Sequence, residues 1–323
     1  MHKGITRREL LGTSLGAAAG FGLSTLPGAA RRVSAAEPVA PAKTMIKRNL
    51  GRTGHQVGLF SLGGESTVER EDRKDEAIEI VQRALDRGVN YIDTAHIYGG
   101  GGSEKNIGEA LEGRRGDVFL ASKTRDRGYD GTMYQFETSL ERLRTDYLDL
   151  YQLHNMRHEQ DLEEAFADDG ALKAMEKLRD EGVVRYLGIT GHRDPEILLK
   201  GIRDYDFDCI LLTMNPADQH YRPFQNELLD TAVDKNMGII AMKVTARGNI
   251  FHAEGVQSMK QVLDYVWSLP VSTAIVGITE LEQVEENADL ACGFAPLSTG
   301  QFDEISDLTA MYEEEANFFK YHW

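Results

Sequence analysis

From Met45 onward, the chain repeats one unit: a short run rich in β-branched residues, a loop, and a longer stretch with apolar residues every three or four positions. Runs of the first kind predict strands, and stretches of the second kind predict amphipathic helices. Alternating strands and helices form parallel sheets covered by helices, and eight repeats favour closure into a barrel. The sequence therefore predicts an α/β fold, a (β/α)8 TIM barrel, with strands at Val57–Gly63, Asn90–Ala95, Val118–Thr124, Tyr147–Asn155, Val184–Thr190, Cys209–Asn215, Gly238–Val244 and Ala274–Ile278.

Glycine placement supports the barrel over an open sheet. An open dinucleotide-binding sheet carries the pattern GxGxxG between its first strand and helix, and this chain has no such pattern near its first predicted strand. The run Gly99–Gly102 does not match it and is predicted to be a flexible loop. Met45–Gly58, with turn residues Gly51 and Gly54, is predicted to form a β-hairpin that closes one barrel end.

The barrel domain is predicted to cover residues 45–290, followed by a C-terminal helix and aromatic tail over residues 291–323. The helix is expected at Gln301–Glu315, and residues 318–323 are mostly aromatic. Two interpretations of the aromatic end remain open: it packs on the barrel, or it shapes a substrate pocket.

The first 36 residues have the charged, apolar and small-residue order of a removable signal peptide. Arg7 and Arg8 directly precede a weak apolar run, as in the twin-arginine export signal. These features predict residues 1–36 to be a twin-arginine signal peptide, residues 37–44 to be a linker, and the export machinery to be a partner. The protein is then expected in the periplasm or otherwise exported, without a stable membrane anchor. The alternative is a disordered basic N-terminus with chance arginines.

The formal net charge of the chain is −16. Such a protein repels nucleic-acid backbones and anionic lipids, so nucleic acid and membrane surfaces are not expected partners. The two cysteines, Cys209 and Cys292, are far apart and show no metal-ligand or redox spacing. No metal site is predicted.

Polar side chains stand at the ends of three successive predicted strands: Asp93, Lys123 and His154. Barrel enzymes carry their chemistry at the carboxyl ends of the strands. Lys123 lies on the apolar face of its strand and is therefore expected to be buried. A buried lysine needs a partner, and Asp93 on the adjacent strand offers one. A nearby phenol, Tyr98, is then expected to have a lowered pKa and to serve as a proton donor, with His154 orienting the substrate or relaying the proton. The alternative is a buried Asp–Lys pair that only ties two strands together.

Several segments around these residues have a specific joint order and spacing: Tyr91–Gly99, Ser103–Gly108, Ser122–Thr124, Tyr147–His154, and Ile275–Gly277 followed by Glu286 and Asn287. Over about residues 45–290 they resemble the motifs of the aldo-keto reductase family. The resemblance implies that Tyr98 is the general acid, that Lys123 tunes it, that Asp93 holds Lys123, and that His154 positions the carbonyl group. It also implies NAD(P)H as the cofactor and source of hydride.

The expected nicotinamide and pyrophosphate contacts depart from the family pattern. Where the family commonly has a serine and an asparagine after the fifth strand, this chain has Thr190, which keeps a hydroxyl, and no asparagine. Asn215 after the sixth strand is a candidate replacement. His192 stands in the place of the family's nicotinamide contacts, and a solvated loop residue is the alternative interpretation for it. After the seventh strand, Lys243 and Arg247 are candidate phosphate contacts, with solvated loop residues as the alternative.

The adenosine end departs further. NADPH-preferring relatives place basic residues between the last strand and the Glu-Asn pair, but Gly277–Gln283 holds two acids and no base. A carboxylate opposes the 2′-phosphate that an arginine would bind, so the choice between NAD and NADP stays open. The resemblance places the remaining cofactor contacts at Gly277, Gln283, Glu286 and Asn287.

The sequence and this resemblance together predict an NAD(P)H-dependent oxidoreductase that reduces aldehydes or ketones, or oxidises the matching alcohols, of small-molecule size. One alternative is a nucleotide-binding regulatory or partner-binding subunit on the same fold. Another is an unrelated barrel lyase, which needs no nicotinamide.

Overall fold

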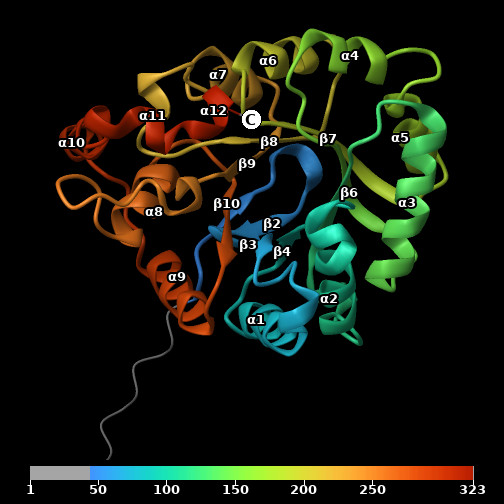
Figure 1. The fold of residues 1–323 in the computed structure, drawn as a ribbon, viewed down its shortest axis with the longest axis horizontal. Coiled ribbons are helices and arrows are strands. Elements are labelled where there is room, and N and C mark those ends of the chain that lie inside the picture. The colour runs from blue at the N-terminus through green and yellow to red at the C-terminus, as the bar shows by residue number, and fades with distance from the viewer. Residues whose placement is uncertain (1–43, 323) are drawn as a thin grey trace, which may run out of the picture. The chain divides into compact units, whose positions relative to one another are not determined.

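The computed structural model describes residues 44–322 and confirms the predicted (β/α)8 barrel (Figure 1). Parallel strands close in the order β10-β3-β4-β5-β6-β7-β8-β9. The predicted signal peptide, 1–36, and all of the predicted linker except Thr44 lie outside the described residues. The barrel strands are β3 Phe60–Ser66, β4 Tyr91–Asp93, β5 Phe119–Thr124, β6 Leu148–Leu153, β7 Val184–Gly191, β8 Cys209–Thr213, β9 Gly238–Met242 and β10 Thr273–Ile278.

Helices surround the barrel (Figure 1), and most of them cover the crossover between two strands. Local sequence sets their ends: α6 begins at Pro195, which needs no N–H partner, and the Asp194 carboxylate accepts from the backbone N–H of Glu196 at 3.1 Å. The helices are α1 Lys74–Asp86, α2 Gly102–Ala110, α3 Tyr129–Leu143, α4 Glu159–Ala165, α5 Ala171–Asp180, α6 Pro195–Asp204, α7 Glu227–Asp234, α8 Met259–Ser268 and α9 Leu281–Gly293.

The predicted hairpin is present: β1 (Lys47–Asn49) pairs antiparallel with β2 (Gln56–Gly58). Leu50 and Val57 pack with Tyr91 and other interior side chains, so the hairpin closes the end where the strands begin. The predicted strand at 57–63 was wrong in joining β2 to β3. Gly58, directly before the break at residue 59, was the available signal for it.

Side chains alternate between the two faces of each barrel strand. On β5, Phe119 and Ala121 belong to the interior cluster, whereas Leu120 packs with the helix-facing core. Lys123 continues the interior series and is 1% exposed, as its sequence position predicted. The strand pattern therefore directs an ammonium group into the barrel at the end where the strands finish.

The glycine run after Tyr98 is a packed turn, which corrects the predicted flexible loop. Gly99, Gly100 and Gly101 all have positive φ and join a 3-10 turn to α2. A Cβ on Gly99 would lie 2.1 Å from the backbone oxygen of Glu69, so only glycine fits there. The run fixes the approach of Tyr98 to the barrel.

The C-terminal segment is broken into short helices, so the single helix predicted at Gln301–Glu315 was wrong. The Thr309 hydroxyl donates to the Ser306 carbonyl at 2.6 Å and contacts the Pro216 carbonyl at 3.2 Å, which turns the chain after the first helix. The segments are α10 Thr299–Asp307, α11 Glu313–Ala316 and α12 Phe318–His322.

Candidate active site

Four predicted residues meet at the carboxyl ends of neighbouring strands. Asp93 ends β4, Lys123 lies on β5, and His154 directly follows β6, while Tyr98 stands in the turn after β4. Lys123 Nζ donates to the Asp93 carboxylate and to the carbonyl of Thr94 at 2.7 Å. Asp93 and Lys123 are each 1% exposed, so the predicted buried ion pair is confirmed.

Tyr98 lies against this pair. Lys123 Nζ is 3.4 Å from Tyr98 Oη and 4.8 Å from the centre of its ring, and the rings of Tyr98 and His154 meet edge to face at 5.6 Å. Burial, with the carboxylates of Glu65 and Asp93, raises the pKa of Tyr98 well above its usual value. The expectation that Lys123 lowers this pKa was therefore wrong: desolvation outweighs the ammonium. Tyr98 is protonated at neutral pH, the form that a proton donor needs.

His154 is the second candidate proton carrier. Burial, with the positive charge of Lys123 nearby, lowers its pKa well below the usual value. The ring is therefore neutral at physiological pH and can orient a substrate oxygen through an N–H without carrying charge. Within residues 44–322, the buried Nδ1 atom has no hydrogen-bond partner.

Tyr98, Lys123 and His154 line a cavity of about 220 Å³, together with several residues that the sequence analysis did not single out. Among these are Glu65, Glu69, Arg125 and Arg157, all of which follow or end barrel strands. Behind the cavity, buried Gln152 donates from Nε2 to Asp93 Oδ1 at 3.2 Å. In the sequence, Gln152 could have been noticed as a polar residue inside the buried strand β6.

Of the predicted nicotinamide contacts, Thr190 lines the cavity and Asn215 does not. Thr190 Oγ1 accepts from the backbone N–H of Asn155 at 2.7 Å. His192 is 6% exposed, lines the cavity, and packs its ring on that of Phe319 at 6.0 Å, so the solvated-loop interpretation was wrong. Burial, with the cations Lys243 and Arg157, lowers the pKa of His192 to about 3.

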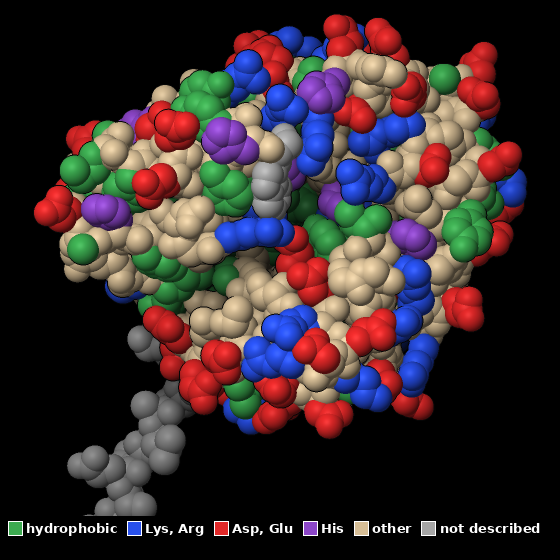
Figure 2. Space-filling view, in the orientation of Figure 1, with side chains coloured by type: hydrophobic (Ala, Val, Ile, Leu, Met, Phe, Trp, Pro, Cys, Tyr) green, Lys and Arg blue, Asp and Glu red, His purple; other side chains and the backbone are tan. Residues whose placement is uncertain are grey.

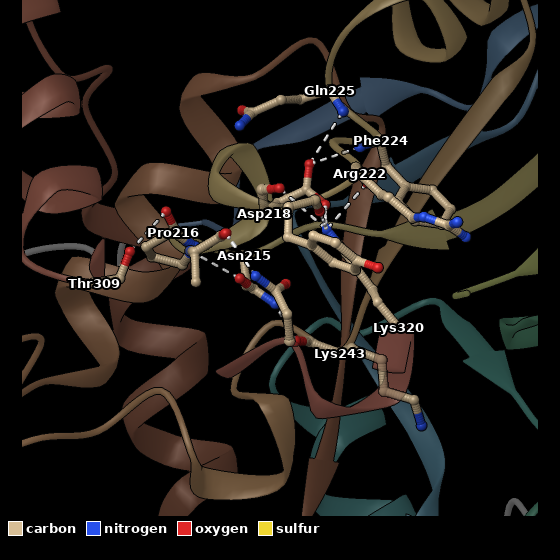
Figure 3. A network of polar contacts seen from close by, with 12 residues as sticks. Asn215, Pro216, Asp218, Arg222, Phe224, Gln225, Lys243, Thr309 and Lys320 are labelled. Atoms are coloured by element: carbon tan, nitrogen blue, oxygen red, sulfur yellow. Dashed lines mark hydrogen bonds and ion pairs between the residues drawn. The ribbon is translucent and has the colours of Figure 1, made fainter. Parts of the chain in front are cut away.

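Asn215 does not line the cavity; it supports the chain beside it (Figure 3). Its Nδ2 donates to the Lys243 carbonyl at 3.3 Å, and its Oδ1 accepts from the backbone N–H of Ala217 at 2.9 Å. Lys243 and Arg247 do line the cavity, and both pair with Glu65, at 3.2 Å and 2.9 Å. These two cations lie where an anionic cofactor group would find positive charge.

The predicted adenosine contacts lie on β10 and α9. Gly277 pairs with Gly63 of β3, and the Gln283 side chain caps α9 by accepting from the backbone N–H of Thr279 at 2.8 Å. Glu286 is exposed, whereas Asn287 is 2% exposed. Its buried Oδ1 has no hydrogen-bond partner in the described chain, which leaves an acceptor for an amino group such as that of adenine.

No group of three or more His, Cys, Asp or Glu side chains in residues 44–322 is arranged to hold a metal ion. The arrangement can instead move a proton at Tyr98 beside a fixed ammonium, and the buried Asn287 oxygen with the Lys243 and Arg247 charges fits a nicotinamide dinucleotide.

Comparisons with known proteins agree. The sequence model of the Aldo/keto reductase family matches residues 56–261. An uncharacterized oxidoreductase of Bacillus subtilis, YqkF, is 28% identical over 76% of this chain and 91% of its own length. D-threo-aldose 1-dehydrogenase of a Pseudomonas species is 30% identical over 76% of this chain and 81% of its own length. An aldo-keto reductase of Klebsiella pneumoniae, solved in complex with NADPH, superposes with a TM-score of 0.67 at 25% identity, covering 84% of this chain and 96% of that one.

Proposed function

The chain belongs to the Aldo/keto reductase family and is an NAD(P)H-dependent carbonyl oxidoreductase, and we propose that Tyr98 donates the proton in its reaction. The observation that carries this role is the position of Tyr98 Oη, 3.4 Å from the ammonium of buried Lys123. A phenol next to a cation can release its proton when a stronger base forms beside it, because the cation stabilises the phenolate.

When bound, NAD(P)H would supply the hydride for the carbonyl carbon. Tyr98 Oη–H gives its proton to the carbonyl oxygen as that oxygen becomes basic, and the phenolate is left beside Lys123 Nζ. Asp93 holds this ammonium in place, and Gln152 holds Asp93 in turn. His154 orients the carbonyl oxygen toward Tyr98. Because its imidazole is neutral, it does not compete with Tyr98 as the proton donor.

For the cofactor, we assign residues by the chemistry of their side chains. Thr190 offers a hydroxyl to the nicotinamide amide, and Lys243 and Arg247 offer positive charge to the pyrophosphate. Asn287 offers its buried oxygen to adenine. Asn215 acts indirectly, because both ends of its amide are engaged by backbone groups.

The preference for NADH or NADPH depends on whether a basic residue binds the 2′-phosphate. The segment Gly277–Gln283 has none, so such a residue would have to come from another loop. Arg73, from the connection between β3 and α1, lies 3.7 Å from Glu280 and donates to Thr67 Oγ1 at 3.2 Å. It also pairs with Glu76. We propose that these carboxylates occupy Arg73, so that the protein uses NADH at least as readily as NADPH.

The alternative of a regulatory subunit finds no support in the comparisons, and a lyase would not need the nucleotide. The function is tested by screening small aldehydes and ketones with NADH and NADPH and following cofactor oxidation. We expect turnover of at least one carbonyl class. Tight cofactor binding without any turnover would instead favour the regulatory subunit.

We also propose that residues 1–36 direct twin-arginine export to the periplasm, on the strength of the paired arginines before a weak apolar run. Within residues 44–322, no helix has the length and apolarity needed to cross a membrane. Replacing Arg7 and Arg8 together by lysine should strand the precursor in the cytoplasm. Fractionation that shows unchanged export, or a mature protein still beginning at Met1, would contradict the proposal.

A further inference from the structure

The active-site cavity has two sides that differ in charge balance. On the side of β3 and β9, Lys243 and Arg247 both pair with one carboxylate, that of Glu65. On the side of β5 and β6, the lining includes Arg125 and Arg157 and no acidic residue. Figure 2 shows Lys and Arg side chains gathered around the hollow near the middle of the face drawn there.

The arginines of the second side lack a counter-ion in the part of the chain that the structure describes. Among residues 44–322, no carboxylate oxygen lies within 4.0 Å of Arg125, Arg157 or the nearby Arg193. The acid beside Arg157 is committed elsewhere: Asp161 pairs with Arg127 at 3.1 Å and accepts from the backbone N–H of Arg157 at 2.9 Å. In a chain with a net charge of −16, such a group of unneutralised cations at a cavity is unusual and needs an explanation.

These cations also repel one another. Partial burial, with Arg125 and Arg193 close by, lowers the pKa of Arg157. Its guanidinium is held by the side-chain amide of Asn155, whose oxygen accepts from Arg157 Nε at 2.9 Å when the amide nitrogen faces His192. The fold therefore holds a positive charge toward the cavity at a cost that a bound anion would offset.

We infer that the substrate is a small carbonyl compound that carries an anionic group, a carboxylate or a phosphate. The inference rests on the proposed function, because it places the carbonyl group at Tyr98 and His154 and the anion at Arg157 and Arg125. A guanidinium matches both anions, since its planar fork donates two parallel hydrogen bonds to their oxygens. The cavity volume of about 220 Å³ suits a small substrate.

The first test compares aldehydes that differ only in the anion. Succinic semialdehyde and butanal form a pair for the carboxylate, and glyceraldehyde 3-phosphate and glyceraldehyde form a pair for the phosphate. We expect the wild type to have the higher kcat/KM for the anionic member of at least one pair, and the pair that shows this identifies the anion. Arg157→Gln should reduce that advantage, measured as the ratio of kcat/KM for the anionic to the neutral aldehyde, by roughly 10- to 100-fold.

Two further variants keep the result interpretable. Arg125→Gln alters an exposed side chain and should act in the same direction if Arg157→Gln does not fold. Arg203→Gln removes an arginine that pairs with Glu227 outside the cavity and should leave the ratio between the aldehydes unchanged.

The second test does not depend on turnover. Succinate or inorganic phosphate, titrated by calorimetry into the protein with NADPH present, should bind to the wild type and to Arg203→Gln but lose affinity in Arg157→Gln. If no aldehyde is reduced, the proposed function fails and this titration still decides the anion site. Equal use of anionic and neutral aldehydes, or anion binding that survives both arginine substitutions, would overturn the inference.

Discussion

The molecule contains two buried lysine–aspartate pairs that look alike and differ in surroundings. Lys123 and Asp93 lie at the ends of β5 and β4, each 1% exposed. Lys320 and Asp218 join α12 to the connection after β8, with both side chains fully buried (Figure 3). Burial raises the pKa of both carboxyl groups, and the ammonium partner opposes that shift in each. Charge pairing and burial therefore do not distinguish a catalytic lysine from a structural one.

The acceptors around each ammonium do distinguish them. Lys320 Nζ donates to Asp218 Oδ1 at 2.6 Å and to the backbone carbonyls of Tyr221 at 2.7 Å and Asp218 at 3.0 Å. An ammonium has three N–H donors, so these groups saturate it. Lys123 has two such acceptors, and its third neighbour is the phenol of Tyr98, a group that can change its charge. Under the proposed mechanism, the contact of Lys123 with Tyr98 is what gives this lysine a role in proton transfer.

The largest effect should separate the two lysines by activity. Lys123→Met should lower kcat by roughly 100- to 10,000-fold, because the phenolate of Tyr98 loses its cation. Its affinity for NADPH should persist, as measured by quenching of protein fluorescence. Lys320→Met, assayed at a temperature where it is folded, should keep kcat. A similar loss of kcat in both variants would break the distinction.

Stability should show a large effect for the structural pair. Lys320→Met leaves Asp218 buried without its ion partner, and we expect the free energy of unfolding in urea to fall by about 3–5 kcal/mol. Lys200→Met, which removes an exposed partner of Asp204 on α6, should change it little. Equal midpoints for the two variants would show that the C-terminal pair does not stabilise the fold.

The sequence revealed the first pair and concealed the second for a physical reason. Lys123 interrupts the apolar face of a strand whose neighbour ends in Asp93, so the pairing follows from strand order. Lys320 and Asp218 are 102 residues apart, in segments without periodicity, and only the tertiary fold joins them. The barrel, the hairpin and the meeting of Asp93, Lys123 and His154 could be predicted because local period and strand order determine them.

Other features depended on interactions that the sequence does not display. Burial of Tyr98 reversed the expected direction of its pKa shift, since desolvation depends on the finished packing. The burial of His192 arises in the same way, because its ring meets Phe319 from the far C-terminal segment. The absence of a carboxylate within 4.0 Å of Arg157 in residues 44–322 was equally hidden, because it depends on where the carboxylates of those residues lie.

The pH dependence should show that Tyr98, and not His154, carries the proton. The pKa of Tyr98 is raised, so its proton stays bound below that pKa, and reduction should be nearly constant between about pH 6 and 9. Alcohol oxidation needs the phenolate and should rise about tenfold per pH unit over this range. The lowered pKa of His154 keeps it neutral throughout. A change in the rate of reduction with a midpoint near pH 7 would show that His154 is the proton donor.

The smallest expected effect is on the preference between NADPH and NADH. Thr279→Arg adds a cation beside the predicted ribose site and should raise the affinity for NADPH relative to NADH by roughly 5- to 30-fold, the worth of one charge-assisted hydrogen bond. Arg73→Gln serves as the matched variant. A wild type that strongly prefers NADPH, and loses that preference in Arg73→Gln, would show that Arg73 already binds the 2′-phosphate.

The central claim is that Tyr98 donates the proton, and Tyr98→Phe tests it most directly. The substitution removes one oxygen from a site that Asp93 and Lys123 hold in place, so NADPH should still bind. In a single turnover of an accepted aldehyde, NADPH oxidation should be slower by on the order of 100-fold or more, as the loss of a general acid predicts. Near-normal reduction by the purified variant would contradict the account.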